Sequence, residues 1–180
     1  KAGLVPAIWK GGLHGSEKWL IRDLIPGSRP LDSLETTLIQ VASDKGSHLH
    51  EQLTRDENGL LRVADIILPN DGSELVIVID QFEEVFTQVT DEEARQHFLD
   101  LIRATVTDKQ SRVYIIVTLR ADYYDRPLHY PEFGEMLRSR MDTILPLTAK
   151  GLERAISGPA ERVGVTFEAG LVAQIVSEMN

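Results

Sequence analysis

The chain of 180 residues contains no cysteine, which excludes disulfide bonds and thiolate metal sites. It also lacks any apolar run near the ~20 residues that a membrane-spanning helix needs. The strongest apolar runs, residues 75–79 and 113–119, have the length of strands. The N-terminus carries no apolar stretch of the kind found in signal peptides. Together these absences favour a cytoplasmic protein with no membrane partner.

Basic residues are in the minority. The chain has 19 Lys and Arg against 28 Asp and Glu, for a net charge of −9. Because contacts to a nucleic-acid backbone need clustered Lys and Arg, we expect no nucleic-acid partner. The share of hydrophobic residues, 42%, is ordinary for a globular protein. The length suits one domain, with room for a small appended subdomain.

Strand-like and helix-like segments alternate along the chain. Strands are expected at 17–25, 75–79 and 113–119, with a short edge strand near Thr143–Leu147. Helical patterns cover 1–9, 31–41, 60–67, 92–108 and 132–140, whereas 43–58 is polar and irregular. This alternation predicts an α/β fold with a parallel sheet between helices. The last 30 residues have the pattern of two or three helices, which predicts a small lid-like subdomain beginning near Ala149.

Three carboxylates follow the most apolar strand. Residues 75–79 are all aliphatic, Asp80 comes directly after them, and Glu83 and Glu84 follow shortly. Ligands of open α/β sheets bind at the carboxyl ends of the strands. A carboxylate at Asp80 can hold a Mg²⁺ ion that bridges nucleotide phosphates, and a second one nearby can orient or deprotonate the attacking water. The same pattern also fits an ordinary turn followed by a solvated acidic loop.

A second polar group follows the strand at 113–119, which ends in Thr118, Leu119 and Arg120. If this strand neighbours the one at 75–79, Arg120 lies beside Asp80 at one edge of the sheet. A guanidinium there can detect a γ-phosphate and stabilise its charge. The alternative is a structural arginine paired with Asp80, Glu84 or Asp122.

Four segments, in order along the chain, carry a family resemblance. The run Ile79-Asp80-Gln81-Phe82-Glu83-Glu84-Val85-Phe86-Thr87 resembles the Walker B region of the bacterial novel STAND NTPases, multidomain signal-transduction ATPases close to the NACHT type. Thr118–Tyr124 resembles their sensor 1 segment, and 155–168 resembles the start of their helical lid. Residues 26–31, after the first strand, match as well.

The resemblance implies an ATPase switch with a P-loop NTPase-like fold of the ASCE/AAA type. Its parallel sheet would have the order 5-1-4-3-2, with a core over residues 1–148 and a lid beginning in 149–180. Asp80 would hold Mg²⁺, and Glu83 and Glu84 would form the catalytic acidic pair, with Glu84 preferred as the base. Thr118 and Arg120 would contact the nucleotide, with Arg120 as the sensor 1 residue.

The partners implied by the resemblance are ATP or ADP and other domains of a larger protein. Family members usually join this module to effector domains and to repeat domains such as β-propellers of WD repeats. Homo-oligomerisation on activation is a further possibility that the resemblance carries.

One family element has no counterpart here. The phosphate-binding loop reads Gly-x-x-x-x-Gly-Lys followed by Ser or Thr, and no Gly-Lys pair occurs in the 180 residues. In the family a helix similar to 2–8 follows that loop. We therefore expect a module truncated after its Walker A loop, which by itself binds nucleotide weakly or not at all and is inactive as an ATPase.

Besides the ATPase switch, the sequence leaves a second and a third class of function open. The missing loop favours a non-catalytic interaction or scaffold module that keeps the NTPase fold. A metal-dependent nuclease using Asp80 and Glu83 is the third, although the acidic charge and the lack of a following lysine disfavour it.

Overall fold

The computed structural model describes residues 3–42 and 48–179, and its contacts divide the chain into two units, 1–140 and 141–180. The strands are β1 (Leu20–Leu24), β2 (Leu75–Ile79) and β3 (Val113–Val117). The helices of the first unit are α1 (Leu4–Trp9), α2 (Pro30–Ala42), α3 (Leu49–Arg55), α4 (Gly59–Ile67), α5 (Glu84–Thr87), α6 (Glu92–Thr107), α7 (Asp125–Leu128) and α8 (Pro131–Ser139). Short 3₁₀ turns, η1 (Ser16–Lys18) and η2 (Ala121–Tyr123), precede β1 and follow β3.

The three strands form a parallel sheet in the order β1-β2-β3, as the alternation of segments predicts. In the register Leu24 pairs with Ile79 and Ile79 pairs with Val117, so all three strands end level with one another. Every residue of β2 is buried. A central strand covered on both faces must be apolar throughout, which is why 75–79 is aliphatic without alternation.

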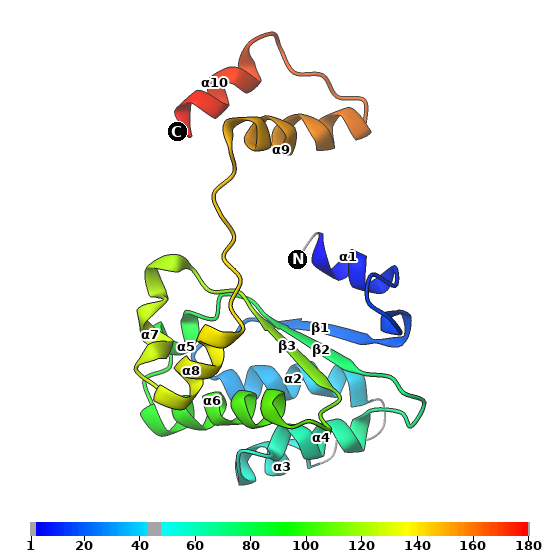
Figure 1. The fold of residues 1–180 in the computed structure, drawn as a ribbon, viewed down its shortest axis with the longest axis vertical. Helices are drawn as coiled ribbons and strands as arrows, with labels where there is room; N and C mark the ends of the chain where they lie inside the picture. The colour runs from blue at the N-terminus through cyan, green and yellow to red at the C-terminus, as the bar shows by residue number, and fades with distance from the viewer. Residues whose placement is uncertain (1–2, 43–47, 180) are drawn as a thin grey trace. The chain divides into compact units, whose positions relative to one another are not determined.

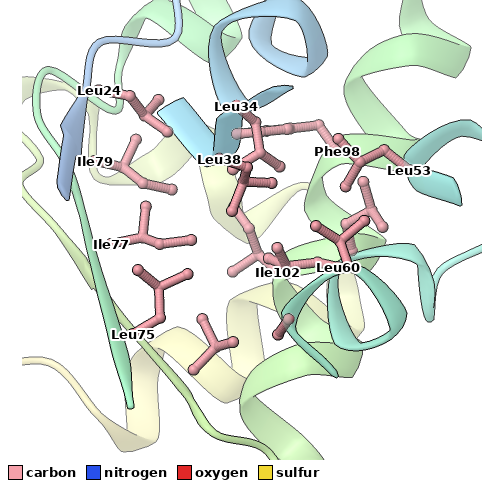
Figure 2. Packing of buried hydrophobic residues seen from close by; sticks show 14 of the residues in the cluster. Leu24, Leu34, Leu38, Leu53, Leu60, Leu75, Ile77, Ile79, Phe98 and Ile102 are labelled. Carbon is pink, nitrogen blue, oxygen red and sulfur yellow. The ribbon is translucent and has the colours of Figure 1, made fainter. Parts of the chain in front are cut away.

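Helices cover both faces of the sheet. Figure 1 shows α2, α4 and α6 on one side and α1 on the other. On the first side, alternate residues of β2, Leu75, Ile77 and Ile79, point into the main core, as strand geometry requires. Figure 2 shows them facing side chains of α2, α3, α4 and α6, among them Leu34, Leu38, Leu53, Leu60, Phe98 and Ile102.

A smaller core lies on the opposite face. Ile8 of α1 packs there against Ile21, Val76 and Val78 of the sheet. Trp19 and Tyr114 stack at its side with ring centroids 4.8 Å apart. Residues Val76 and Val78 of β2 and Ile21 of β1 therefore belong to this second core, so the sheet packs against a helix on each face.

The expected edge strand near Thr143–Leu147 is wrong for this structure. Residues 141–148 form neither helix nor strand, and Ile144 and Leu145 are 94% and 76% exposed. The pattern of apolar residues indicates only a propensity, whereas a strand needs a hydrogen-bonded neighbour, and among the described residues this segment pairs with no strand.

The polar stretch at 43–58 contains a helix that the sequence did not suggest. In α3, Leu49 and Leu53 lie one turn apart and are both 1% exposed. Two leucines among polar residues are too weak a periodic signal, but one turn of spacing is enough to bury both side chains on one face. Residues 43–47 of the stretch lie outside the described residues.

The second unit contains two helices, α9 (Ala149–Arg162) and α10 (Leu171–Glu178), where the sequence predicts helices. The hydroxyl of Thr148 accepts a hydrogen bond from Gly151 N at 3.2 Å and caps the start of α9. Neither helix contains a fully buried residue. Nowhere in the described ranges is a helix both long and apolar enough to cross a membrane.

Replacing Ile77 by alanine tests the packing of the central strand. Ile77 is fully buried, so Ile77→Ala should lower the free energy of unfolding by about 2–5 kcal/mol. Ile66, which is 42% exposed, is the matched control, and Ile66→Ala should change it by about 0.5 kcal/mol at most. Urea titrations followed by circular dichroism measure both. Equal losses from the two variants would contradict the assigned core.

Candidate functional site

The carboxyl ends of β2 and β3 bring Asp80 and Thr118 together. Asp80 N donates a hydrogen bond to Leu24 O, and Thr118 N donates one to Ile79 O, each at 2.9 Å. The ladder of the sheet thus continues one residue past both strands. The backbones that carry the two side chains are therefore fixed by the sheet, as the sequence-based argument for a ligand site at this edge requires.

The side chains of Asp80 and Thr118 are joined directly. The Thr118 hydroxyl donates to Asp80 Oδ1 at 2.5 Å. The backbone N–H of Gln81 lies between them, 3.2 Å from Asp80 Oδ1 and 3.1 Å from Thr118 Oγ1. These contacts hold the Asp80 carboxylate in one orientation. Thr118, expected from the family resemblance to contact nucleotide, here positions the carboxylate proposed to hold the metal.

Residues 80–84 form what we call the acidic turn. Gln81 adopts a left-handed conformation with φ of 55°, which is uncommon for any residue other than glycine. The next residue, Phe82, is fully buried and stacks on Phe133 with centroids 5.8 Å apart. Phe82 N also donates to Thr118 O at 2.9 Å. The chain therefore turns at Phe82, whose side chain and backbone are both held by neighbours, and then enters α5.

Glu84, the first residue of α5, is linked to the loop that follows β1. Its Oε2 accepts a hydrogen bond from Gly27 N at 3.0 Å. Gly27 has a φ of 62°, a conformation that glycine adopts at little cost. The Pro26-Gly27 pair signals a turn in the sequence, but its contact with a residue 57 positions away does not follow from any local pattern. This bond engages Glu84 in holding two loops together.

Glu83 differs from Glu84 in its surroundings. Its side chain is partly buried, and Oε2 is buried without a hydrogen-bond partner within the described part of the chain. Burying a polar atom with no partner is costly, so such atoms call for a specific explanation. A carboxylate oxygen in this position can accept a bond from a water or coordinate a cation.

Arg120 pairs with a near neighbour. Its guanidinium forms two hydrogen bonds with Asp122, at 3.1 and 2.8 Å, and lies 5.7 Å from the ring centre of Tyr123. This is one of the pairings that the sequence left open. The Asp122 hydrogen bonds are the main reason that the pKa of Arg120 is raised, with Glu83 a smaller contributor. Arg120 therefore lies within electrostatic range of the acidic turn while it is bound to Asp122.

The carboxylates at this edge could contribute to a magnesium site in which water and phosphate supply the other ligands. Over residues 3–42 and 48–179, no three His, Asp or Glu side chains come close enough to cage a metal. Mg²⁺ is usually held by one or two carboxylates and completes its shell with waters and phosphates. Asp80, oriented by Thr118, and Glu83, whose buried oxygen has no partner among the residues that the structure describes, could serve as such carboxylates.

Comparison with known proteins supports the family resemblance. The family model described as Novel STAND NTPase 1 matches residues 1–180. Comparisons with curated proteins and with solved structures gave no match. The family match spans the acidic turn, the Arg120 segment and both units described above. The chain therefore belongs to the novel STAND NTPase 1 family and is a STAND-type NTPase module.

Proposed function

We propose that this chain supplies the magnesium-binding and hydrolytic half of an ATPase site in a cytoplasmic signalling switch. One observation carries the proposal: in the turn that follows Asp80, at the carboxyl edge of a parallel sheet, Glu83 has a buried oxygen with no hydrogen-bond partner among the described residues. A ligand that coordinates or donates to this oxygen would offset the cost of burying it. Because the chain belongs to an NTPase family, we take the ligand to be Mg·ATP, bound here through its magnesium ion and phosphates.

Each side chain of the acidic turn has its own role in this proposal. Asp80 holds the magnesium ion, directly or through water, with its orientation set by Thr118. When bound, magnesium would supply positive charge that offsets the negative charge of the phosphates. Glu83 accepts a hydrogen bond from the attacking water and orients it.

Glu84 takes a structural role, which reverses the preference drawn from the sequence. Its Oε2 is occupied by the Gly27 N–H, whereas the buried oxygen of Glu83 has no such partner among the described residues. A water-orienting carboxylate needs an oxygen that no protein donor already engages. The contacts therefore favour Glu83 as the base and Glu84 as the link to the β1–α2 loop.

Arg120 would exchange partners during the cycle. In the structure it is bound to Asp122, and both side chains are well exposed. An exposed ion pair contributes little free energy, so a phosphate can compete for the guanidinium. Arg120 would then report the presence of a γ-phosphate, which is the sensor role that the family resemblance implies.

The phosphate-binding half is proposed to come from outside residues 1–180, because they contain no Gly-Lys pair. In this proposal the observed order β1-β2-β3 would correspond to strands 2, 3 and 4 of the order 5-1-4-3-2. The strand that precedes the loop would then pair with β3, whose outer side has no paired strand in the described residues. Backbone N–H groups of such a loop are what cradle phosphates.

The switch itself would use the second unit as the start of a helical lid. Nucleotide state would set the position of this lid and so control contacts with effector and repeat domains or with further copies of the protein. The alternative is a scaffold that keeps the fold without catalysis, and the absent Gly-Lys pair is the observation that favours it.

Replacing each glutamate by glutamine, its isosteric amide, distinguishes the roles of Glu83 and Glu84. The variants are made in a chain extended upstream by about 40 residues, enough for a strand and a loop. Glu83→Gln should bind Mg·ATP within about threefold of wild type but lower turnover about 10²–10⁴-fold, since it removes the water-orienting carboxylate. Glu84→Gln should keep turnover within about tenfold, because an amide oxygen can still accept from Gly27. Calorimetry and phosphate release measure the two quantities.

The controls for this experiment are Asp80→Ala and the 180-residue chain. Asp80→Ala should weaken magnesium-dependent binding, and the shorter chain should bind weakly. A larger loss of turnover from Glu84→Gln than from Glu83→Gln would contradict the assigned roles. Failure of the extended wild-type chain to bind nucleotide at all would leave the scaffold as the function.

Removing the competing carboxylate tests the role of Arg120. In the extended chain, Asp122→Asn should tighten Mg·ATP binding by about two- to fivefold, the range expected for release from an exposed ion pair. Asp125, which forms an exposed pair with Arg126, is the matched control, and Asp125→Asn should leave affinity unchanged. Weaker binding by Asp122→Asn, measured by calorimetry, would show that the pair supports the site instead of competing with it.

A further inference from the structure

Arg95 reaches from the first turn of α6 to the helix that follows the acidic turn. Its side chain is 14% exposed. Nε donates to Val85 O at 3.0 Å, and Nη2 donates to Val89 O. Nη1 contacts the Glu92 carboxylate and lies 3.3 Å from the Tyr130 hydroxyl oxygen. One guanidinium thus joins two backbone carbonyls to two side chains.

The Val85 carbonyl lies within α5 and the Val89 carbonyl just beyond its end, and this helix has little stability of its own. Helix α5 has four residues, Glu84–Thr87, far fewer than an isolated helix needs in water. The last carbonyls of any helix lack partners within it, and a cation near that end interacts favourably with them. Arg95 supplies both the hydrogen bond and the charge, so it closes the end of α5 opposite the acidic turn.

Tyr130 fixes Arg95 from the other side. Its hydroxyl donates to Glu92 Oε1 at 2.7 Å, and its ring lies 5.9 Å from the ring of Phe86 in α5. Burial is the main cause of the raised pKa of Tyr130, so the hydroxyl keeps its proton and remains a donor. Tyr130 belongs to the segment that follows Arg120 and precedes α8. The contacts therefore join α5, α6 and this segment at one point.

We propose that Arg95, held by Tyr130, is a positioning residue that orients the acidic turn by fixing the carbonyl end of α5. The proposal rests on the proposed function for the roles of Glu83 and Glu84, but its geometry is independent of any nucleotide. Arg95 touches no group assigned to metal or phosphate. It acts through α5, whose first residue, Glu84, bonds to Gly27.

The Gly27 amide reports whether the turn is in place. Its N–H is bonded to Glu84 Oε2, and amide proton resonances respond to loss of a charged acceptor. In ¹⁵N–¹H spectra of the 180-residue chain, Glu84→Ala defines the Gly27 position without the bond. Arg95→Lys, which keeps the charge but loses the forked geometry, should move the Gly27 resonance most of the way to that position.

Hydrogen exchange supplies a second readout from the same variant. The amides of Thr87 and Gln88 bond to the carbonyls of Glu83 and Glu84 within the α5 turn. Loss of the Arg95 contacts should speed their exchange about tenfold, as expected for removal of charge-assisted hydrogen bonds. Exchange of the Ile77 amide in the central strand should not change. A role in overall stability alone would leave the Gly27 resonance in place.

Arg103→Lys is the matched control. Arg103 lies on the same helix, but its ion pairs are with Asp100 and Glu132, neither of which belongs to α5. An unmoved Gly27 resonance in Arg95→Lys, or an equal shift in Arg103→Lys, would overturn the proposal. If Arg95→Lys does not fold, Tyr130→Phe decides: a Gly27 shift in the same direction supports the proposal and an unmoved resonance overturns it. Because no nucleotide is present, loss of the ATPase function would not alter these outcomes.

Discussion

The parallel register of β2 between two neighbours is the constraint on which the site depends. Since Leu24, Ile79 and Val117 are level, the residues that follow them must emerge at one edge of the sheet. Asp80 and Thr118 are neighbours for that reason, although they are 38 positions apart in sequence. A slip of one residue in β2 would also turn its inward side chains away from the main core. The packing that stabilises the sheet therefore also determines the placement of the carboxylate.

The acidic turn contains features that are costly unless the surrounding structure supports them. Gln81 holds a left-handed backbone conformation, and Glu83 buries an oxygen that has no partner in the described residues. Three surrounding contacts stabilise the turn and offset this cost. Phe82 is buried, Glu84 accepts a hydrogen bond from Gly27, and Arg95 donates to a carbonyl of α5. Such local strain, held by its surroundings, is often found at functional sites.

Sequence patterns predicted the parts of the fold that depend on local apolar spacing. The aliphatic run at 75–79 required a central strand, and Asp80, the first polar residue after it, indicated the edge of the sheet where a ligand is proposed to bind. The segment at Thr143–Leu147 is also rich in apolar residues but pairs with no strand in the described part of the chain, whereas α3 forms with only Leu49 and Leu53 as apolar residues. In both cases the outcome depends on what the segment packs against, which local spacing does not contain.

The roles within the site depended on contacts between distant residues. The acidic pair was visible as two adjacent glutamates, but only the bond from Gly27 to Glu84 distinguishes them. For Arg120 the sequence left three carboxylate partners open, and the geometry shows the pairing with Asp122. Arg95 carried no sequence signal at all, because one arginine at the start of an exposed-looking helix is ordinary.

The most direct test of the account is whether a divalent cation binds at the acidic turn. Mn²⁺ can replace Mg²⁺ at carboxylate sites and broadens the resonances of nearby amides. Titrated into the ¹⁵N-labelled 180-residue chain, Mn²⁺ should first broaden the amides of Gln81, Glu83 and Thr118, and Asp80→Ala should abolish this effect. Broadening confined to other acidic surfaces, or unchanged in Asp80→Ala, would contradict the claim that this edge of the sheet is the magnesium half of an ATPase site.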